Sequence, residues 1–189
     1  VNNRVEIDEE WSKNVEIKQI LDGLSSYPNE FWKYPVVIYY LKYRTLNDFE
    51  NLFLKFLKKL FAVLSARYIV TPTINAVKRG ILNLNSEIIN SATPKFDFSI
   101  VDEQELKEKI KTAHRNTVRM ILKILSYRHQ KELLPEKWEI EHILPQKWQS
   151  SYFPNNSDQE VKDLVENIKF RFDSKNNNIQ SNTPSKSLP

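Results

Sequence analysis

The sequence predicts a mainly α-helical body followed by a small C-terminal module, and three observations support this fold class. Apolar residues recur at steps of three and four through much of residues 1–134, the spacing of a helical stripe that faces a core. The chain has only two glycines, whereas a sheet-rich fold with many tight turns usually needs more. Short alternating segments follow Leu134-Pro135. We therefore expect a helical domain at 1–134 and a separate module at 135–189.

Helices are expected at 5–22, 30–43, 47–68 and about 73–90, with one or two more inside 102–131. The segment 47–68 is the clearest, because its apolar residues form one stripe: Phe49, Phe53, Phe56, Leu60 and Val63. Asn47 is a candidate N-cap, and Glu50 three residues later would complete a capping box. Segment 30–43 favours a helix with Pro35 in its first turn, although β-branched Val36, Val37 and Ile38 leave a strand open.

The C-terminal module has a different pattern of apolar and polar residues. Residues 138–143 alternate enough to form a short strand, 159–166 resemble a short helix, and 168–172 alternate like a second strand. Residues 174–189 are polar and rich in Asn and Ser. Two short strands and a helix are therefore expected after the helical body.

Composition excludes several classes of protein and site. Without cysteine the chain can form neither disulfides nor thiolate zinc sites, so any metal must be bound by oxygen and imidazole ligands. Two glycines are too few for a Rossmann or P-loop phosphate cradle. No apolar run of about 18 residues predicts a membrane span, and no signal peptide is visible. We expect a cytoplasmic protein. Because the sequence begins at Val1 without a methionine, we also expect it to be a piece of a longer protein.

Positive charge is concentrated in two intervals that contain no acid. The net charge is only +4, but basic residues gather between Asn51 and Ser86 and again between Lys109 and Lys131. Arg115, Arg119 and Lys123 are spaced i, i+4 and i+8, which predicts one outward stripe that could contact DNA phosphates. The alternative interpretation is an ordinary solvated helix face.

Chemistry is indicated by Glu141-His142, which lie at the end of the first expected strand. A carboxylate is a hard oxygen ligand for Mg²⁺ or Mn²⁺. A neutral histidine can accept a proton from water near pH 7. Hydrolysis of a phosphodiester needs both functions, because water must be activated and the charge on the leaving oxygen must be stabilised. An asparagine carried by a second strand and the start of a helix would complete such a metal site.

The string Ile140-Glu141-His142-Ile143-Leu144-Pro145-Gln146 resembles the signature of the C-terminal HNH (His-Me finger) nuclease domain of GmrSD-type, modification-dependent restriction endonucleases. It is also similar to the HNH domain of RNA-guided CRISPR nucleases. In both groups an asparagine follows in the second strand and another lies nine residues later, as Asn167 and Asn176 do here. The segment 72–78 also resembles the helical part of the restriction-enzyme family, and the resemblance covers about residues 30–182.

The resemblance implies a ββα-metal fold for the module and a role for each matching residue. His142 would be the general base, Glu141 and Asn176 ligands of Mg²⁺ or Mn²⁺, and Asn167 a brace for the loop or the histidine. The family also implies DNA as the substrate and an N-terminal nucleotide-hydrolysing domain that this chain lacks.

Two departures from the family pattern affect the expected site. Glu166 stands before Asn167 where the family usually has glycine, and the segment 178–182 matches the family with one residue missing. Asn178 therefore competes with Asn176 as the second metal ligand. The chain ends seven residues after Asn182, so the family's last helix is expected to be truncated or divergent.

Two functions of different classes are therefore expected. The first is a metal-dependent DNA endonuclease domain of a restriction or phage-defence protein. The second is a non-catalytic helical module that binds DNA or a protein and whose nuclease site has decayed.

Overall fold

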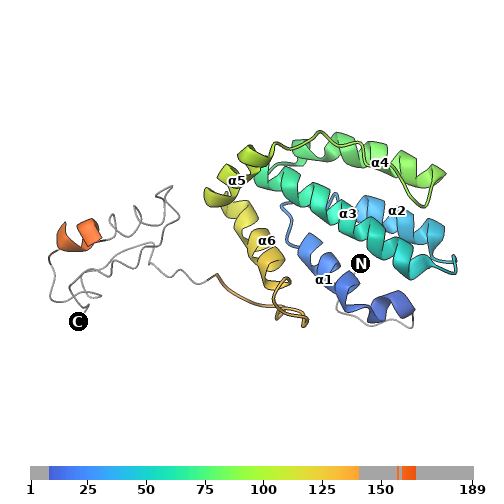
Figure 1. Cartoon of the computed structure of the whole chain (residues 1–189), viewed down its shortest axis with the longest axis horizontal. Helices are drawn as coiled ribbons and strands as arrows, with labels where there is room; N and C mark the ends of the chain where they lie inside the picture. The colour runs from blue at the N-terminus through green and yellow to red at the C-terminus, as the bar shows by residue number, and fades with distance from the viewer. Residues whose placement is uncertain (1–8, 141–156, 158, 165–189) are drawn as a thin grey trace. The chain divides into compact units, whose positions relative to one another are not determined.

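The computed structural model of the chain describes residues 9–140, 157 and 159–164. The chain divides into two compact units, Val1–Glu139 and Ile140–Pro189, and each is treated by itself below (Figure 1). Among the described residues the first unit is built from helices, which confirms the mainly α prediction. In the second unit residues 159–164 are helical, inside the helix predicted at 159–166. Residues 138–140 adopt no strand, and the rest of both predicted strands lies outside the described residues.

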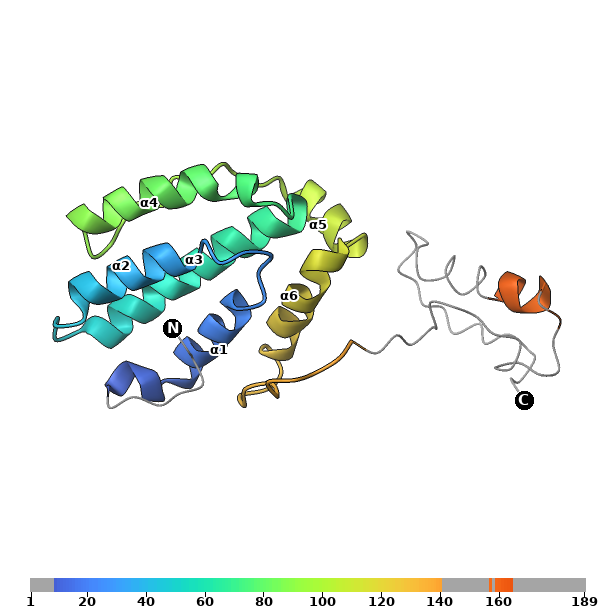
Figure 2. The ribbon, with the colours of Figure 1, turned by 180° about the vertical axis from the view of Figure 1, so that it is seen from behind.

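Helix α3 (Phe49–Val70) is the centre of the first unit. It packs against α1, α2, α5 and α6, and both views show it between α4 on one side and α1 on the other (Figures 1 and 2). Phe53, Phe56 and Leu60 are buried on it, so the predicted phase of this helix is confirmed. The predicted capping box is wrong: Asp48 precedes the helix without a side-chain cap. Glu50 instead accepts a hydrogen bond from Asn14 Nδ2 at 2.6 Å.

The expected helix at 5–22 is divided at Asn14. A 3-10 helix, η1 (Glu10–Lys13), comes first, and α1 (Val15–Leu24) follows. The side chain of Asn14 accepts hydrogen bonds from the backbone N–H groups of Glu16 and Ile17. Such a cap satisfies donors that a helix start otherwise leaves unpaired, and it therefore fixes where α1 begins.

Helices α2 (Lys33–Tyr43) and α4 (Lys78–Asn90) pack against each other. The helical alternative is thus correct for segment 30–43, with Pro35 in the first turn. The helix expected from 73 is interrupted: a 3-10 turn, η2 (Ile74–Ala76), precedes α4. Residues 91–99 form a loop without regular structure. It leads back along the body to α5 (Figure 1).

Segment 102–131 contains two helices, α5 (Glu103–Lys111) and α6 (Arg115–Ser126). Each begins with a side-chain cap. Asp102 Oδ1 accepts from Glu105 N at 2.8 Å, and His114 Nδ1 accepts from Asn116 N at 3.2 Å. These two caps explain why the segment divides near residue 113.

Both glycines of the chain lie in helices where a phenylalanine ring presses on the backbone. A Cβ atom on Gly23 of α1 would meet the ring of Phe61 on α3 at 2.8 Å. One on Gly80 of α4 would overlap the ring of Phe98 in the same way. Neither glycine has a positive φ, so close approach rather than backbone conformation requires them.

Aromatic side chains fill much of the core around α3. Tyr39 is fully buried, stacks on Phe56 with ring centroids 4.1 Å apart, and donates its hydroxyl to the Ala92 carbonyl at 2.7 Å. Burial and the neighbouring Tyr43 raise the pKa of Tyr39 to about 12. Burial likewise raises the pKa of Tyr68 to about 12, although its hydrogen bond to Asn29 acts in the opposite direction. These phenols belong to the core and carry no catalytic assignment.

Candidate functional site

The residues predicted to carry chemistry lie outside the described residues: Glu141, His142, Asn167, Asn176 and Asn178. Their roles therefore stay predictions. Within residues 9–140, 157 and 159–164, no group of three or more His, Cys, Asp or Glu side chains could hold a metal ion. What the structure does describe is the basic helix α6 and the segment that leads from it to the motif.

That segment, residues 127–139 and here called the connector, is held to the helical body. Gln19 of α1 donates its side-chain amide to two connector carbonyls, those of Gln130 at 3.0 Å and Lys131 at 2.8 Å. The Tyr127 hydroxyl accepts a hydrogen bond from the Leu134 backbone N–H at 3.1 Å. The connector thus leaves α6 along a path that α1 and α6 fix by hydrogen bonds (Figure 2).

Lys123 differs from the prediction that it faces outward. Its ammonium group lies 2.8 Å from Asp22 Oδ2 of α1, and only 6% of Lys123 and 2% of Asp22 are exposed. Lys123 Nζ also donates to the Asp22 carbonyl at 3.0 Å, and the Tyr127 hydroxyl donates to the Asp22 carboxylate. Because a buried charge must be paired, Lys123 links α6 to α1 and is not part of an outward stripe.

Arg119 is exposed, but it is also bound to the connector. Its guanidinium carbon lies 4.5 Å from the centroid of the Trp138 ring, and its Nη1 donates to the Trp138 carbonyl at 2.9 Å. Stacking covers one face of the guanidinium and leaves other N–H donors on its edge. Arg115, one turn earlier, is exposed. The predicted DNA-binding set thus retains Arg115 and Arg119 on the surface and loses Lys123.

Several other cations of the two acid-free intervals are also bound to groups of the protein. Lys58 pairs with Glu16 at 2.7 Å, and Lys111 pairs with Glu108 at 3.2 Å. Arg67 donates through Nε and Nη2 to the Ala76 carbonyl at 3.0 and 2.9 Å. Net basic composition therefore overstates the charge available to a polyanion.

Asp22, Gln19 and Tyr127 were not singled out in the sequence. One signal points to Asp22, because a carboxylate inside the apolar run Ile20-Leu21-Asp22-Gly23-Leu24 must find a partner if the run is buried. Nothing local identifies Lys123 as that partner, since the two residues are 101 positions apart.

No protein-family model, no curated protein and no solved structure matches this chain. Among the described residues, none of the helices combines the length and the apolar character needed to cross a membrane. The functional interpretation of the C-terminal module therefore depends on its own residues and their chemistry.

Proposed function

We propose that the chain is the metal-dependent nuclease part of a DNA endonuclease of the restriction or phage-defence type, with an HNH-type site formed by residues 141–178. The observation that carries the proposal is the string Glu141-His142-Ile143-Leu144-Pro145-Gln146, followed by asparagines at 167 and 176. It combines a candidate base and candidate metal ligands within one short module.

The donor set fits a hard divalent cation. Glu141 offers a carboxylate and Asn176 or Asn178 an amide oxygen, the ligand types that Mg²⁺ and Mn²⁺ prefer, and the cysteine-free chain offers no thiolate. When bound, the metal would supply positive charge to stabilise the leaving oxygen. His142 in its neutral form would accept a proton from water as the water oxygen bonds to phosphorus and the bond between phosphorus and the leaving oxygen breaks. Asn167 would orient the loop or the imidazole.

The exposed arginines of the helical body also support the proposal. Arg115 and Arg119 are exposed on α6, and Arg119 binds the connector that precedes the motif. Exposed guanidinium groups are suitable partners for backbone phosphates. We therefore keep Arg115 and Arg119 as proposed DNA contacts and exclude Lys123, whose ammonium group faces Asp22.

Plasmid cleavage with a titration of Mg²⁺ or Mn²⁺ tests the proposal. We expect His142→Ala to lower turnover by roughly 10²–10⁴-fold with DNA binding nearly unchanged, because general-base assistance acts in the transition state. Glu141→Ala should raise the metal concentration needed for half-activity. Of Asn176→Ala and Asn178→Ala, the variant that behaves like Glu141→Ala identifies the second ligand.

The matched control is His129→Ala, which removes an exposed histidine of the connector and should leave cleavage unchanged. Cleavage by His142→Ala at the wild-type rate would refute the assigned mechanism. A wild-type chain that neither binds metal nor cuts DNA would refute the endonuclease function.

A second candidate is a non-catalytic module that binds a protein. It is favoured by Tyr34, Val37 and Leu41 of α2, which are spaced along one helix face and are 58%, 37% and 62% exposed. Exposed apolar patches of this kind often mark contact surfaces. Failure of metal binding together with retained binding of a protein partner through this face would select the second candidate.

A further inference from the structure

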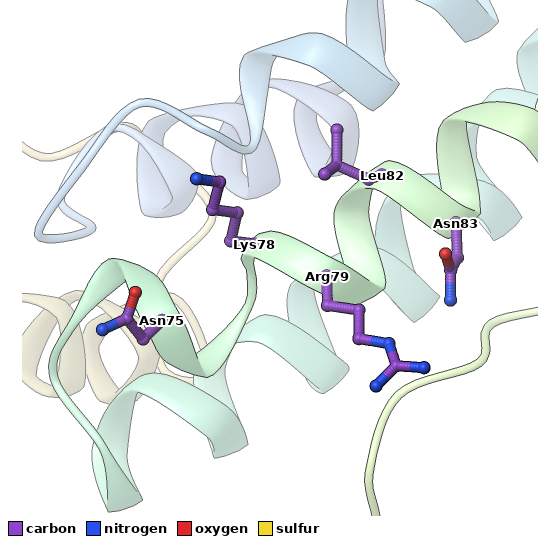
Figure 3. Close-up of a pocket in the computed structure, with 5 residues that line it drawn as sticks. All are labelled: Asn75, Lys78, Arg79, Leu82 and Asn83. Atoms are coloured by element: carbon purple, nitrogen blue, oxygen red, sulfur yellow. The ribbon is translucent and has the colours of Figure 1, made fainter.

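A hollow on the surface lies at the start of α4, among residues outside the nuclease motif. It is lined by Asn75, Lys78, Arg79, Leu82 and Asn83, and its volume is about 340 Å³. All five side chains are exposed. Figure 3 shows Lys78 and Leu82 on one side of the helix and Arg79 and Asn83 on the other, and both cations line the hollow.

The backbone beneath these side chains is held firmly. Arg67 of α3 binds the Ala76 carbonyl through two N–H groups and the Ser99 carbonyl at 3.3 Å through a third. Val77 is fully buried, and the Phe98 ring presses on Gly80. Since the frame is fixed before any ligand arrives, little ordering of the backbone would oppose binding.

The polar groups around the hollow are available for a ligand. Within the part of the chain that the structure describes, no hydrogen bond or ion pair involves the side chains of Asn75, Lys78, Arg79 or Asn83. Among the described residues, no carboxylate lines the hollow. Arg67, in the same acid-free interval, instead directs its guanidinium at backbone carbonyls. The hollow therefore presents a guanidinium, an ammonium and two amides that have no hydrogen-bond or ion-pair partner among the residues the structure describes.

We infer that this hollow binds phosphate groups of a DNA backbone. Arg and Lys are the usual phosphate partners, and asparagine amides add neutral donors of the kind that position a protein on the backbone. Small-molecule sites bury most of their ligand, whereas here every lining side chain is exposed, which suits a polymer that passes across the surface. The inference rests on the proposed function only for the choice of DNA as the polyanion.

The test is the binding of the full chain to a fluorescent DNA duplex, measured by anisotropy over a series of salt concentrations. The slope of log affinity against log salt is negative, and each lost phosphate contact reduces its magnitude by about 0.9. We therefore expect the double variant Lys78→Gln/Arg79→Gln to reduce the magnitude of this slope by roughly 2. Asn83→Leu should weaken binding and leave the slope unchanged, because the amide carries no charge.

The matched control also removes one lysine and one arginine. In Lys42→Gln/Arg44→Gln the lost cations belong to the end of α2, where Lys42 binds the Ile89 carbonyl at the far end of α4. The net charge falls equally in the two double variants. Because Lys42 and Arg44 do not line the hollow, we expect the control to leave the salt slope unchanged. An equal fall in both double variants would overturn the inference, because bulk charge would then explain the effect.

Three further results separate this inference from its neighbours. If Lys78→Gln/Arg79→Gln binds DNA with the affinity and salt slope of the wild type and still cuts it, the phosphate site is overturned and the endonuclease proposal stands. Loss of binding in that variant, with no cleavage by the wild type, supports the site and refutes the endonuclease. Displacement of DNA by inorganic phosphate or polyglutamate at concentrations similar to that of the DNA would overturn the inference in favour of a small anion or an acidic peptide.

Discussion

Replacement of Lys123 by methionine would remove the ammonium group that faces Asp22 while keeping a long apolar stem in the same space. The two groups are 2.8 Å apart, and their side chains are only 8% and 3% exposed. Deleting one partner of a buried ion pair leaves the other charge without compensation, which costs about 3–5 kcal/mol. That is a large share of the roughly 5–15 kcal/mol that stabilises a typical domain.

Urea unfolding followed by circular dichroism and tryptophan fluorescence measures this cost. We expect the Lys123→Met midpoint to fall at an unchanged m-value, since the surface exposed on unfolding is the same. The control is Lys107→Met, which breaks an exposed pair with Glu103 and should leave the urea midpoint nearly unchanged, because solvent screens a pair at the surface. In the double variant Lys123→Met/Asp22→Leu most of the loss should be recovered, because neither charge remains.

A loss below about 1 kcal/mol for Lys123→Met would refute this reasoning, since the pair would then behave like a surface pair. A double variant as unstable as the single one would show that packing at Lys123, and not the orphaned carboxylate, sets the cost.

Two further predictions concern the core. Phe56→Ala should lower the free energy of unfolding by about 3–5 kcal/mol, because Phe56 is buried and stacks on Tyr39; a loss under about 1 kcal/mol in urea unfolding would contradict this packing. The contribution of the Tyr68 phenol to stability should be fully present below pH 10.0 and be lost as the pH rises toward 12, since its pKa is raised from 10.0 to about 12 in the folded state and the unfolded chain releases that proton first. Urea midpoints across this range measure the fall; Tyr68→Phe should reduce it, and an unchanged pH dependence in that variant would refute the assignment.

The helical phases could be predicted because each core stripe is local. Phe53, Phe56 and Leu60 lie on one side of a single helix, so the steps of three and four between them directly indicate the buried face. The start of α3 could not be predicted in the same way. Glu50, expected to cap its own helix, is bound by Asn14 from a distant part of the chain, and such a tertiary contact leaves no local signal.

Lys123 shows why the basic stripe was only partly correct. At 3.6 residues per turn, positions i and i+8 differ by about 80° around the helix, so Lys123 is turned well away from Arg115. That rotation brings it toward α1, beside buried Met120, and places it opposite Asp22. A stripe defined by spacing alone could not reveal a partner supplied by another helix. The chemistry of Glu141, His142 and the three asparagines is inferred from the sequence, because these five positions lie outside the described residues.

The two helical glycines restrict which substitutions homologues of this helical body can accept. Gly23 and Phe61 share one volume, as do Gly80 and Phe98, so in each pair the size of one residue limits the size of the other. Homologues with alanine or serine at position 23 should therefore have a residue smaller than phenylalanine at position 61, and the same reciprocity should link positions 80 and 98. Correlated substitution at these pairs would record helix spacing directly, even where little else in the sequence remains recognisable.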